Sequence, residues 1–324
     1  MRGSNLKRAE EARGGEPPKG ELVGSMDVTS AEELRARSIA IALMFAALFC
    51  FACLDTSGKW LSRHIPIWEV VWARYMGATL FVLLFINPAT TPRMLSTSRP
   101  GLQLIRALLL FGATALNFFA LRWLQLAQTV SIAFAGPLLI ALFAGPILGE
   151  WVGPRRLIAI IVGFLGVIVV TRPSLSGIHP AMLLSFGATT CNCFYSILTR
   201  VLAASDSSRT TTFFSAISGA VILTPALPFF WVTPPDWNVW LFLVLIGGFG
   251  GLGHWLLILA HGRAPAALLA PFAYTQIVWM IVFGYIVFGD LPDVWTLTGA
   301  GIVIASGLYL LYRSRVVRRA KKAV

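Results

Sequence analysis

Long apolar runs separated by short polar connections fill the chain from residue 38 to residue 312. Within a run the apolar positions are continuous and do not alternate with polar ones, so they predict helices and exclude a closed barrel. A helix needs about 20 apolar residues to cross a bilayer. We therefore expect ten transmembrane helices, at 38–60, 67–87, 102–123, 126–148, 153–171, 179–203, 209–231, 238–260, 266–288 and 293–312.

The composition agrees with this pattern and excludes several classes of protein. Of the 324 residues, 57% are hydrophobic and 12% are charged, whereas a soluble domain carries about 25% charged residues. Intrinsic disorder, a disulfide scaffold and a nucleic-acid-binding domain are therefore excluded for the chain as a whole, and nucleic acid is not an expected partner. The sequence predicts an all-α polytopic membrane protein surrounded by the lipid bilayer.

The four cysteines lie inside apolar runs, where we expect them to pack as small apolar side chains. No cluster of metal-ligating side chains accompanies them in the sequence, so we expect neither a metal site nor a cofactor. They are Cys50, Cys53, Cys191 and Cys193.

Basic residues are distributed unevenly around the predicted helices. The net charge is +12. With the N-terminus in the cytoplasm, twenty Lys and Arg residues fall in inside segments and three, Arg63, Arg122 and Arg172, in outside segments. This bias places both termini in the cytoplasm, which requires an even number of spans. We expect residues 1–37 to be a disordered cytoplasmic tail and residues 313–324 a basic cytoplasmic tail.

We interpret Met26 as an alternative start of the chain. It precedes Ser30-Ala-Glu-Glu33, a sequence typical of a capping box at the beginning of a helix. Residues 1–25 contain no apolar face to bury, and we expect them to be dispensable for insertion.

The chain contains an internal repeat with a shift of 140 residues. Gly149-Glu150 then falls on Gly289-Asp290, and the hydropathy of the flanking runs matches. Each unit, 38–171 and 179–312, holds five predicted spans. Because an odd number of spans reverses direction, the second unit is expected to be inverted relative to the first. Inverted repeats are typical of secondary transporters, which bind their cargo near the bilayer midplane between the repeats.

The same stretches resemble a known family. Residues 120–172 and 260–307 look like the first and second EamA domains of the drug/metabolite transporter superfamily. The resemblance covers about residues 38–312, and it implies a ten-helix carrier of small organic molecules in a bacterial cytoplasmic (inner) membrane. It rests on Ala120–Ala127, Gly136-Pro137, Gly149-Glu150, Arg155-Arg156, Gly163–Val167, Gly289-Asp290 and Gly299. Asp290 stands where many relatives carry Glu.

Ionisable and polar side chains within the apolar runs are candidates for the cargo site, because an Asp, Lys or Arg at the bilayer centre costs about 2.5–3.5 kcal/mol. Asp55 and Lys59 lie four residues apart, so they either pair with each other or line the cargo path. Arg74 offers a planar fork for an anionic group. The remaining candidates, which either bind cargo or make interhelical hydrogen bonds, are Asn117, Gln128, Asn192, Tyr195, His254, Trp255, Tyr274 and Gln276.

Three further acidic residues and two prolines have structural interpretations. We expect Glu69 to be solvated near the outer interface, and Glu150 and Asp290 to be interface or capping residues. Gly136-Pro137 is expected to break the fourth span, and Pro271, early in the ninth span, to kink it, since proline removes a helical hydrogen bond.

The sequence therefore predicts a secondary transporter that moves a small organic solute by alternating access. The alternatives are a membrane-embedded enzyme, for which the chain has no H-E-x-x-H or G-x-S-x-G motif, and a non-transporting sensor. No Walker A motif is present to supply ATP. Trp72, Tyr75 and the aromatic candidates above suit a ring-bearing solute, and proton coupling and a homodimer are left open.

Overall fold

The computed structural model describes residues 19–87, 90, 92, 94–172 and 179–322. In this part of the chain all regular secondary structure is helical, and turns and loops connect the helices. The helices are α2 (Lys19–Leu61), α3 (Ile67–Phe85), α4 (Pro100–Leu121), α5 (Leu126–Ala133), α6 (Gly136–Leu148), α7 (Pro154–Thr171), α8 (Pro180–Leu202), α9 (Ser208–Leu223), α10 (Leu227–Phe230), α11 (Trp237–Arg263), α12 (Ala266–Ala273), α13 (Gln276–Phe288) and α14 (Val294–Lys322).

Nine segments of the described chain are long and apolar enough to cross a membrane. They correspond to all the predicted spans except the seventh, which we expected at 209–231. There the chain forms α9, with 16 residues, followed by the short α10. Pro225 and Pro228 have no amide hydrogen with which to continue the ladder of α9, so the helix stops at about 24 Å.

Large apolar side chains remain exposed around the bundle, as expected for a protein in contact with lipid. Leu80, Leu84 and Ile158 are 59%, 71% and 61% exposed. Together with the nine apolar helices, this surface identifies a multi-pass membrane protein.

The tail expected at residues 1–37 is helical over residues 19–37, because α2 begins at Lys19. Residues 1–18 lie outside the described part. The expectation of disorder was wrong for residues 19–37, where the helix of the first span continues toward the N-terminus without a new nucleation step. Ser30 lies inside α2, so the predicted capping box is not a helix start.

The fourth predicted span is broken, as expected, and the ninth is broken as well, although Pro271 itself lies inside α12. The breaks lie at Phe134-Ala135 and at Tyr274-Thr275, 140 residues apart. Both segments then end on a left-handed glycine, Gly149 with φ 73° and Gly289 with φ 69°. Glycine adopts this conformation without a Cβ clash. The next residue donates its N–H back into the helix in both cases, over 3.1 Å from Glu150 and 2.9 Å from Asp290.

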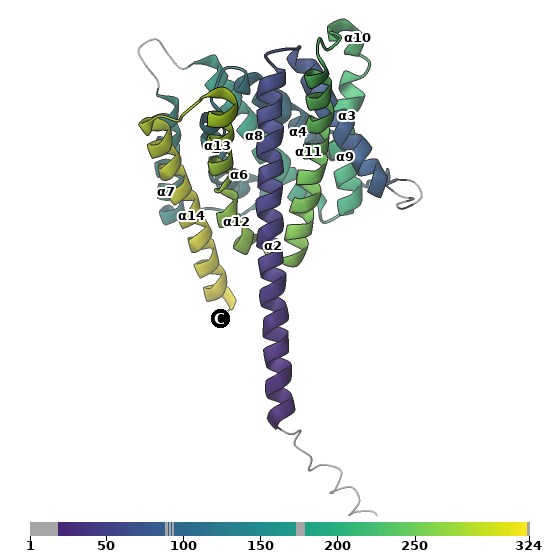
Figure 1. Cartoon of the computed structure of the whole chain (residues 1–324). Helices are drawn as coiled ribbons and strands as arrows, with labels where there is room; N and C mark the ends of the chain where they lie inside the picture. The colour runs from purple at the N-terminus through teal and green to yellow at the C-terminus, as the bar shows by residue number, and fades with distance from the viewer. Residues whose placement is uncertain (1–18, 88–89, 91, 93, 173–178, 323–324) are drawn as a thin grey trace, which may run out of the picture.

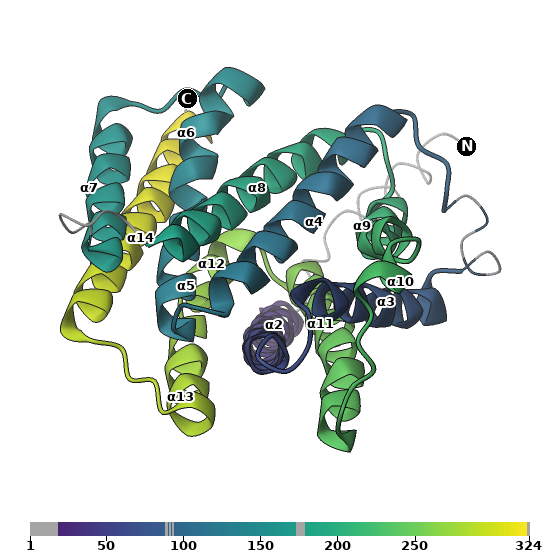
Figure 2. The same ribbon diagram turned by 90° about the horizontal axis from the view of Figure 1, so that it is seen from above.

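The two halves of the chain interleave. Helix α2 packs against α11, α4 against α8, α3 against α9, and α7 against α14. Figure 2 shows α2, α3 and α11 grouped together, with α4 and α8 running side by side and α7 beside α14. At the closest approach of α3 and α11, a Cβ built on Gly77 would lie 2.5 Å from the Cα of Gly247. These helices therefore require glycine at their crossing.

The first and last helices leave the bundle at the same end. In Figure 1 the N-terminal part of α2 and the C-terminal part of α14 both extend downward, beyond the other helices. The opposite end carries the C-terminus of α2 and the connection from α13 to α14.

Candidate functional site

The central candidate site is formed by charged side chains that α4 holds in place. Asn117 of α4 donates from Nδ2 to Oδ1 of Asp55 on α2, over 3.1 Å. One turn earlier on α4, Thr114 accepts a hydrogen bond of 2.9 Å from Nη1 of Arg74 on α3. A spacing of three residues places Thr114 and Asn117 on one face of α4, so one helix face fixes both a carboxylate and a guanidinium.

The hydroxyl of Thr114 is fully used. It donates to the carbonyl oxygen of Leu110 over 3.0 Å, and it lies 3.2 Å from the hydroxyl of Tyr75. A hydroxyl has one hydrogen and two lone pairs, so Thr114 accepts from both Arg74 and Tyr75. This arrangement fixes the guanidinium through Nη1, whereas Nε is buried and has no partner among the described residues.

Helix α11 completes the site. His254 lies within electrostatic range of Arg74, and its ring makes an edge contact with Phe51 of α2 at 5.0 Å between centroids. A Cβ on Gly250, one turn earlier, would touch Leu54 at 3.1 Å and the stem of Arg74 at 4.0 Å. The structure thus brings together four of the predicted site residues, Asp55, Arg74, Asn117 and His254.

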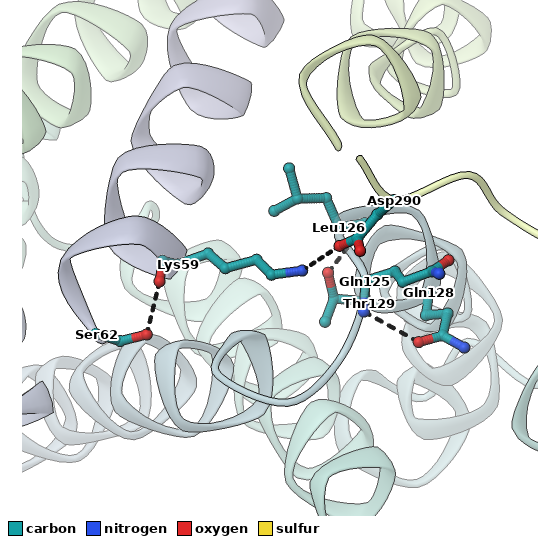
Figure 3. Close-up of polar contacts among 7 residues, drawn as sticks. All are labelled: Lys59, Ser62, Gln125, Leu126, Gln128, Thr129 and Asp290. Atoms are coloured by element: carbon teal, nitrogen blue, oxygen red, sulfur yellow. Dashed lines mark hydrogen bonds and ion pairs between the residues drawn. The ribbon is translucent and has the colours of Figure 1, made fainter. Parts of the chain in front are cut away.

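Asp55 and Lys59 do not pair with each other, contrary to one of the two expectations for them. Lys59 instead forms an ion pair with Asp290, with 2.6 Å between Nζ and Oδ2. Figure 3 shows the ammonium of Lys59 directed from α2 across to Asp290. The ring of Phe288 also lies 4.6 Å from Nζ. Residues that share a helix face can point to different neighbours, and here the tertiary neighbours decide.

Glu150 and Asp290 are more than caps. Glu150, which follows the left-handed Gly149, forms an ion pair with Arg200 in the last turn of α8. Lys59 lies in the last turn of α2. Each acidic residue therefore pairs with a base on a helix of the other half of the chain.

The profile of the EamA-like transporter family matches twice, at residues 38–172 and 179–313. The chain belongs to the EamA-like transporter family. One relative is an S-adenosylmethionine uptake transporter of Rickettsia bellii, 28% identical, with 88% of this chain and 97% of the relative covered. Another is a riboflavin transporter of Brucella anthropi, 28% identical over 83% of this chain and 96% of the relative.

A solved crystal structure has the same fold as this EamA-like chain. Its TM-score is 0.59 and its identity is 19%, and the match covers 86% of this chain and 99% of the other. At this identity the likeness concerns the fold alone.

The other predicted site residues of the EamA-like chain make their contacts outside this group of four. The side chain of Gln128 accepts from the backbone N–H of Gln125 over 3.0 Å and so caps α5 (Figure 3). Trp255 is 40% exposed and stacks on Phe85. Asn192 is exposed on α8 and Gln276 is half-buried at the start of α13.

Two tyrosines among the candidates have contrasting surroundings. Tyr274 is buried against Phe134 at the break of the ninth span, and its hydroxyl has no partner among the described residues. Tyr195 occupies in α8 the position that Asp55 occupies in α2, 140 residues earlier. Its hydroxyl lies 3.4 Å from that of Ser215. The second half of the chain therefore carries a neutral side chain where the first carries a carboxylate.

Glu69 is fully buried, which corrects the expectation that it would be solvated. The segment after α10 covers it, and its Oε2 accepts from the backbone N–H of Val232 over 3.2 Å. Because proline ends α9 early, the chain folds back over the start of α3, and hydropathy alone does not reveal this return.

Sequence reasoning missed Thr114 and a buried network around Arg106. Arg106 of α4 is fully buried, and it donates from Nε to Gln103 over 3.1 Å and from Nη2 to the carbonyl of Thr211 over 2.6 Å. Gln103 in turn donates to Asp206 over 2.7 Å. The spacing of Thr114 and Asn117 is a signal that could have identified Thr114.

The four cysteines are free thiols. In the described part of the chain, no group of three or more His, Cys, Asp or Glu side chains could hold a metal ion.

Proposed function

We propose that this chain is a secondary transporter that carries a small ring-bearing organic metabolite by alternating access. The observation that carries the proposal is the central cluster of Asp55, Arg74, Asn117 and His254, in which helices of both repeats surround two charged side chains of the first repeat inside a membrane protein. Such groups are costly in a membrane and are typical of cargo paths. The named cargoes of the two relatives, S-adenosylmethionine and riboflavin, both contain heteroaromatic rings.

Ten crossings in two inverted repeats are the proposed architecture. Both terminal helices leave the bundle at one end, which favours an even number of crossings (Figure 1). Nine candidate spans together with the shorter α9 give ten. The contacts between helices also support a two-fold relation, because exchanging the repeats converts the α2–α11 contact into the α8–α4 contact.

The ion pairs at the two ends are proposed to close the alternating pathway. Lys59–Asp290 joins the first repeat to the second at one end, and Arg200–Glu150 does the same at the other. Opening the site to one side would break the pair at that side and leave the other formed. A bistable arrangement of this kind is what alternating access requires.

Orientation is proposed from the distribution of basic residues, with both termini in a bacterial cytoplasm. A reporter fused after Arg313 is expected to be cytoplasmic. A reporter inserted in the loop 233–236 is expected to be periplasmic. A cytoplasmic result at that loop would contradict both the orientation and the count of ten crossings.

Solute flux in proteoliposomes tests the transport itself. We expect labelled S-adenosylmethionine or riboflavin to exchange across vesicles containing the purified chain and to be recovered chemically unchanged. Arg74→Ala should abolish exchange. Thr190→Val is the matched control, because the hydroxyl of Thr190 bonds only to the carbonyl of Phe186 on its own helix. A folded chain that exchanges no ring-bearing solute, or returns a modified product, would refute the proposal.

A further inference from the structure

We infer that the cargo carries a zwitterionic α-amino-acid group, whose ammonium binds Asp55 and whose carboxylate binds Arg74. This inference rests on the proposed transport function and specifies its cargo. The named cargoes of the relatives divide on this point, since S-adenosylmethionine has such a group and riboflavin has none.

The opposite charges of Asp55 and Arg74 are held close to each other without forming an ion pair. Asp55 and Arg74 act on each other electrostatically, yet the ion pairs of the described residues do not include them. Opposite charges in a membrane interior normally pair, because pairing offsets part of the cost of desolvation. A site that keeps them apart leaves each charge available to a ligand that carries the two complementary charges.

Helix α4 holds the two groups in separate hydrogen bonds. Asn117 holds Oδ1 of Asp55, and Thr114 holds Nη1 of Arg74, one turn apart on the same face. Thr114 is itself fixed by Leu110 and Tyr75. The carboxylate and the guanidinium are therefore positioned before any ligand arrives, which reduces the entropy lost on binding.

The carboxylate of Asp55 and the guanidinium of Arg74 both retain hydrogen-bonding capacity. Asp55 and Arg74 are half-buried, and Oδ2 of Asp55 makes no hydrogen bond within the described chain and is not sealed off from solvent. Of the five N–H donors of Arg74, Thr114 takes one. An ammonium donates to a carboxylate, and a carboxylate accepts two parallel hydrogen bonds from a guanidinium. An α-amino acid presents these two groups on one carbon.

The charges of Asp55 and Arg74 have no counterparts at the equivalent positions of the second repeat. The residues 140 positions after Asp55 and Arg74 are Tyr195 and Phe214, both uncharged. An ion pair required by the architecture of the repeat would recur in both halves, as the pairs of Glu150 and Asp290 do. The one-sided placement of Asp55 and Arg74 therefore serves recognition of the polar end of an asymmetric cargo.

The test compares ring-matched solutes on the unmodified chain in proteoliposomes. One series keeps the indole ring and comprises tryptophan, tryptamine without the carboxylate, and indole-3-propionate without the ammonium. A second keeps the adenosine ring and comprises S-adenosylmethionine and 5′-methylthioadenosine, with riboflavin as a ring-bearing reference. We expect the zwitterion of at least one series to be exchanged about tenfold faster or more than its analogues, because each missing charge leaves a site group unpaired.

Two variants sharpen the test. Arg74→Lys keeps the charge but loses the fork, so it should slow exchange of the zwitterion and leave that of the carboxylate-free analogue unchanged. Asp55→Asn should likewise slow exchange of the zwitterion and leave that of the ammonium-free analogue unchanged. Thr190→Val is the control for both variants. Faster exchange of riboflavin or 5′-methylthioadenosine than of both zwitterions would overturn the inference and leave the transport proposal standing. No exchange of any of these solutes would overturn both.

Discussion

The two ends of the bundle are joined by ion pairs of the same construction but of different burial. At one end Lys59 and Asp290 are 3% and 25% exposed. At the other end Arg200 and Glu150 are 53% and 52% exposed. In both, a base in the last turn of a helix meets the acid that follows a left-handed glycine. The repeat supplies the positions of the charges, and the local packing decides how much each pair contributes to stability.

The two ends also differ in their further connections, because the end of Lys59 and Asp290 has a second, exposed ion pair between Arg172 and Asp293, whereas the exposed end has a hydrogen-bond network. Asp206, in the turn between α8 and α9, accepts from Thr97 over 2.6 Å and from Gln103 over 2.7 Å. Both of these bonds are to Oδ2, and Oδ1 accepts from the backbone N–H and the hydroxyl of Ser98 over 3.3 Å, so the carboxylate connects the turn to α4 and to the segment before it. One end is thus held by a buried charge pair, and the other by a hydrogen-bond network beside a solvated pair.

Asp290→Asn is expected to have the largest effect on stability. It leaves the ammonium of Lys59 buried without a carboxylate, which costs about 3–5 kcal/mol. Thermal unfolding in detergent should show a large fall in Tm. Asp236→Asn is the control, since Asp236 is an exposed loop acid that makes no side-chain cap.

The double variant Lys59→Met with Asp290→Leu separates charge burial from loss of the side chain. Replacing both partners with apolar residues removes the unpaired charge, so most of the stability should return. A double variant as unstable as Asp290→Asn would show that the pair is not what holds this end together.

These ends also mark what the sequence could predict. The 140-residue shift identified the repeat. Gly136-Pro137 identified the broken fourth span, because caps and prolines act locally. The partner of Lys59 lies 231 positions away, and no local pattern distinguishes it from Asp55. The repeat held a usable signal for this partner. Glu150 is equivalent to Asp290, and the residue equivalent to Lys59 is residue 199, which adjoins Arg200.

The central site shows the same division between local and tertiary information. The cost of a charge in an apolar run singled out Asp55 and Arg74, and both lie in the site. The same reasoning selected Gln128, whose amide caps a helix, because a polar side chain at a helix start and one in a cargo path look alike in sequence. The burial of Glu69 depends on where the chain after α9 returns, which only the fold determines.

Asp206→Asn is expected to have an intermediate and pH-dependent effect. Desolvation of Asp206 opposes its ionisation, but hydrogen bonds from Thr97, Gln103 and Ser98 prevail and hold the pKa of its carboxyl below the ordinary 3.8. A lowered folded-state pKa gives stability above the unfolded value that is lost as the pH falls through the folded one. The Tm difference from the unmodified chain should be full at neutral pH and shrink below pH 3.8. A difference independent of pH would rule out the charge as its cause.

Glu150→Gln is expected to have the smallest effect and to differ from Asp290→Asn in its response to salt. An exposed pair contributes about 0–1 kcal/mol, because water already solvates both charges and the long side chains lose freedom when they pair. At about 1 M salt the Debye length falls to about 3 Å, so this small contribution should vanish. The destabilisation by Asp290→Asn should persist, because salt ions do not reach a buried ammonium. If salt removed the effects of both substitutions equally, Lys59 would be as solvated as Arg200, and the contrast between the two ends would fail.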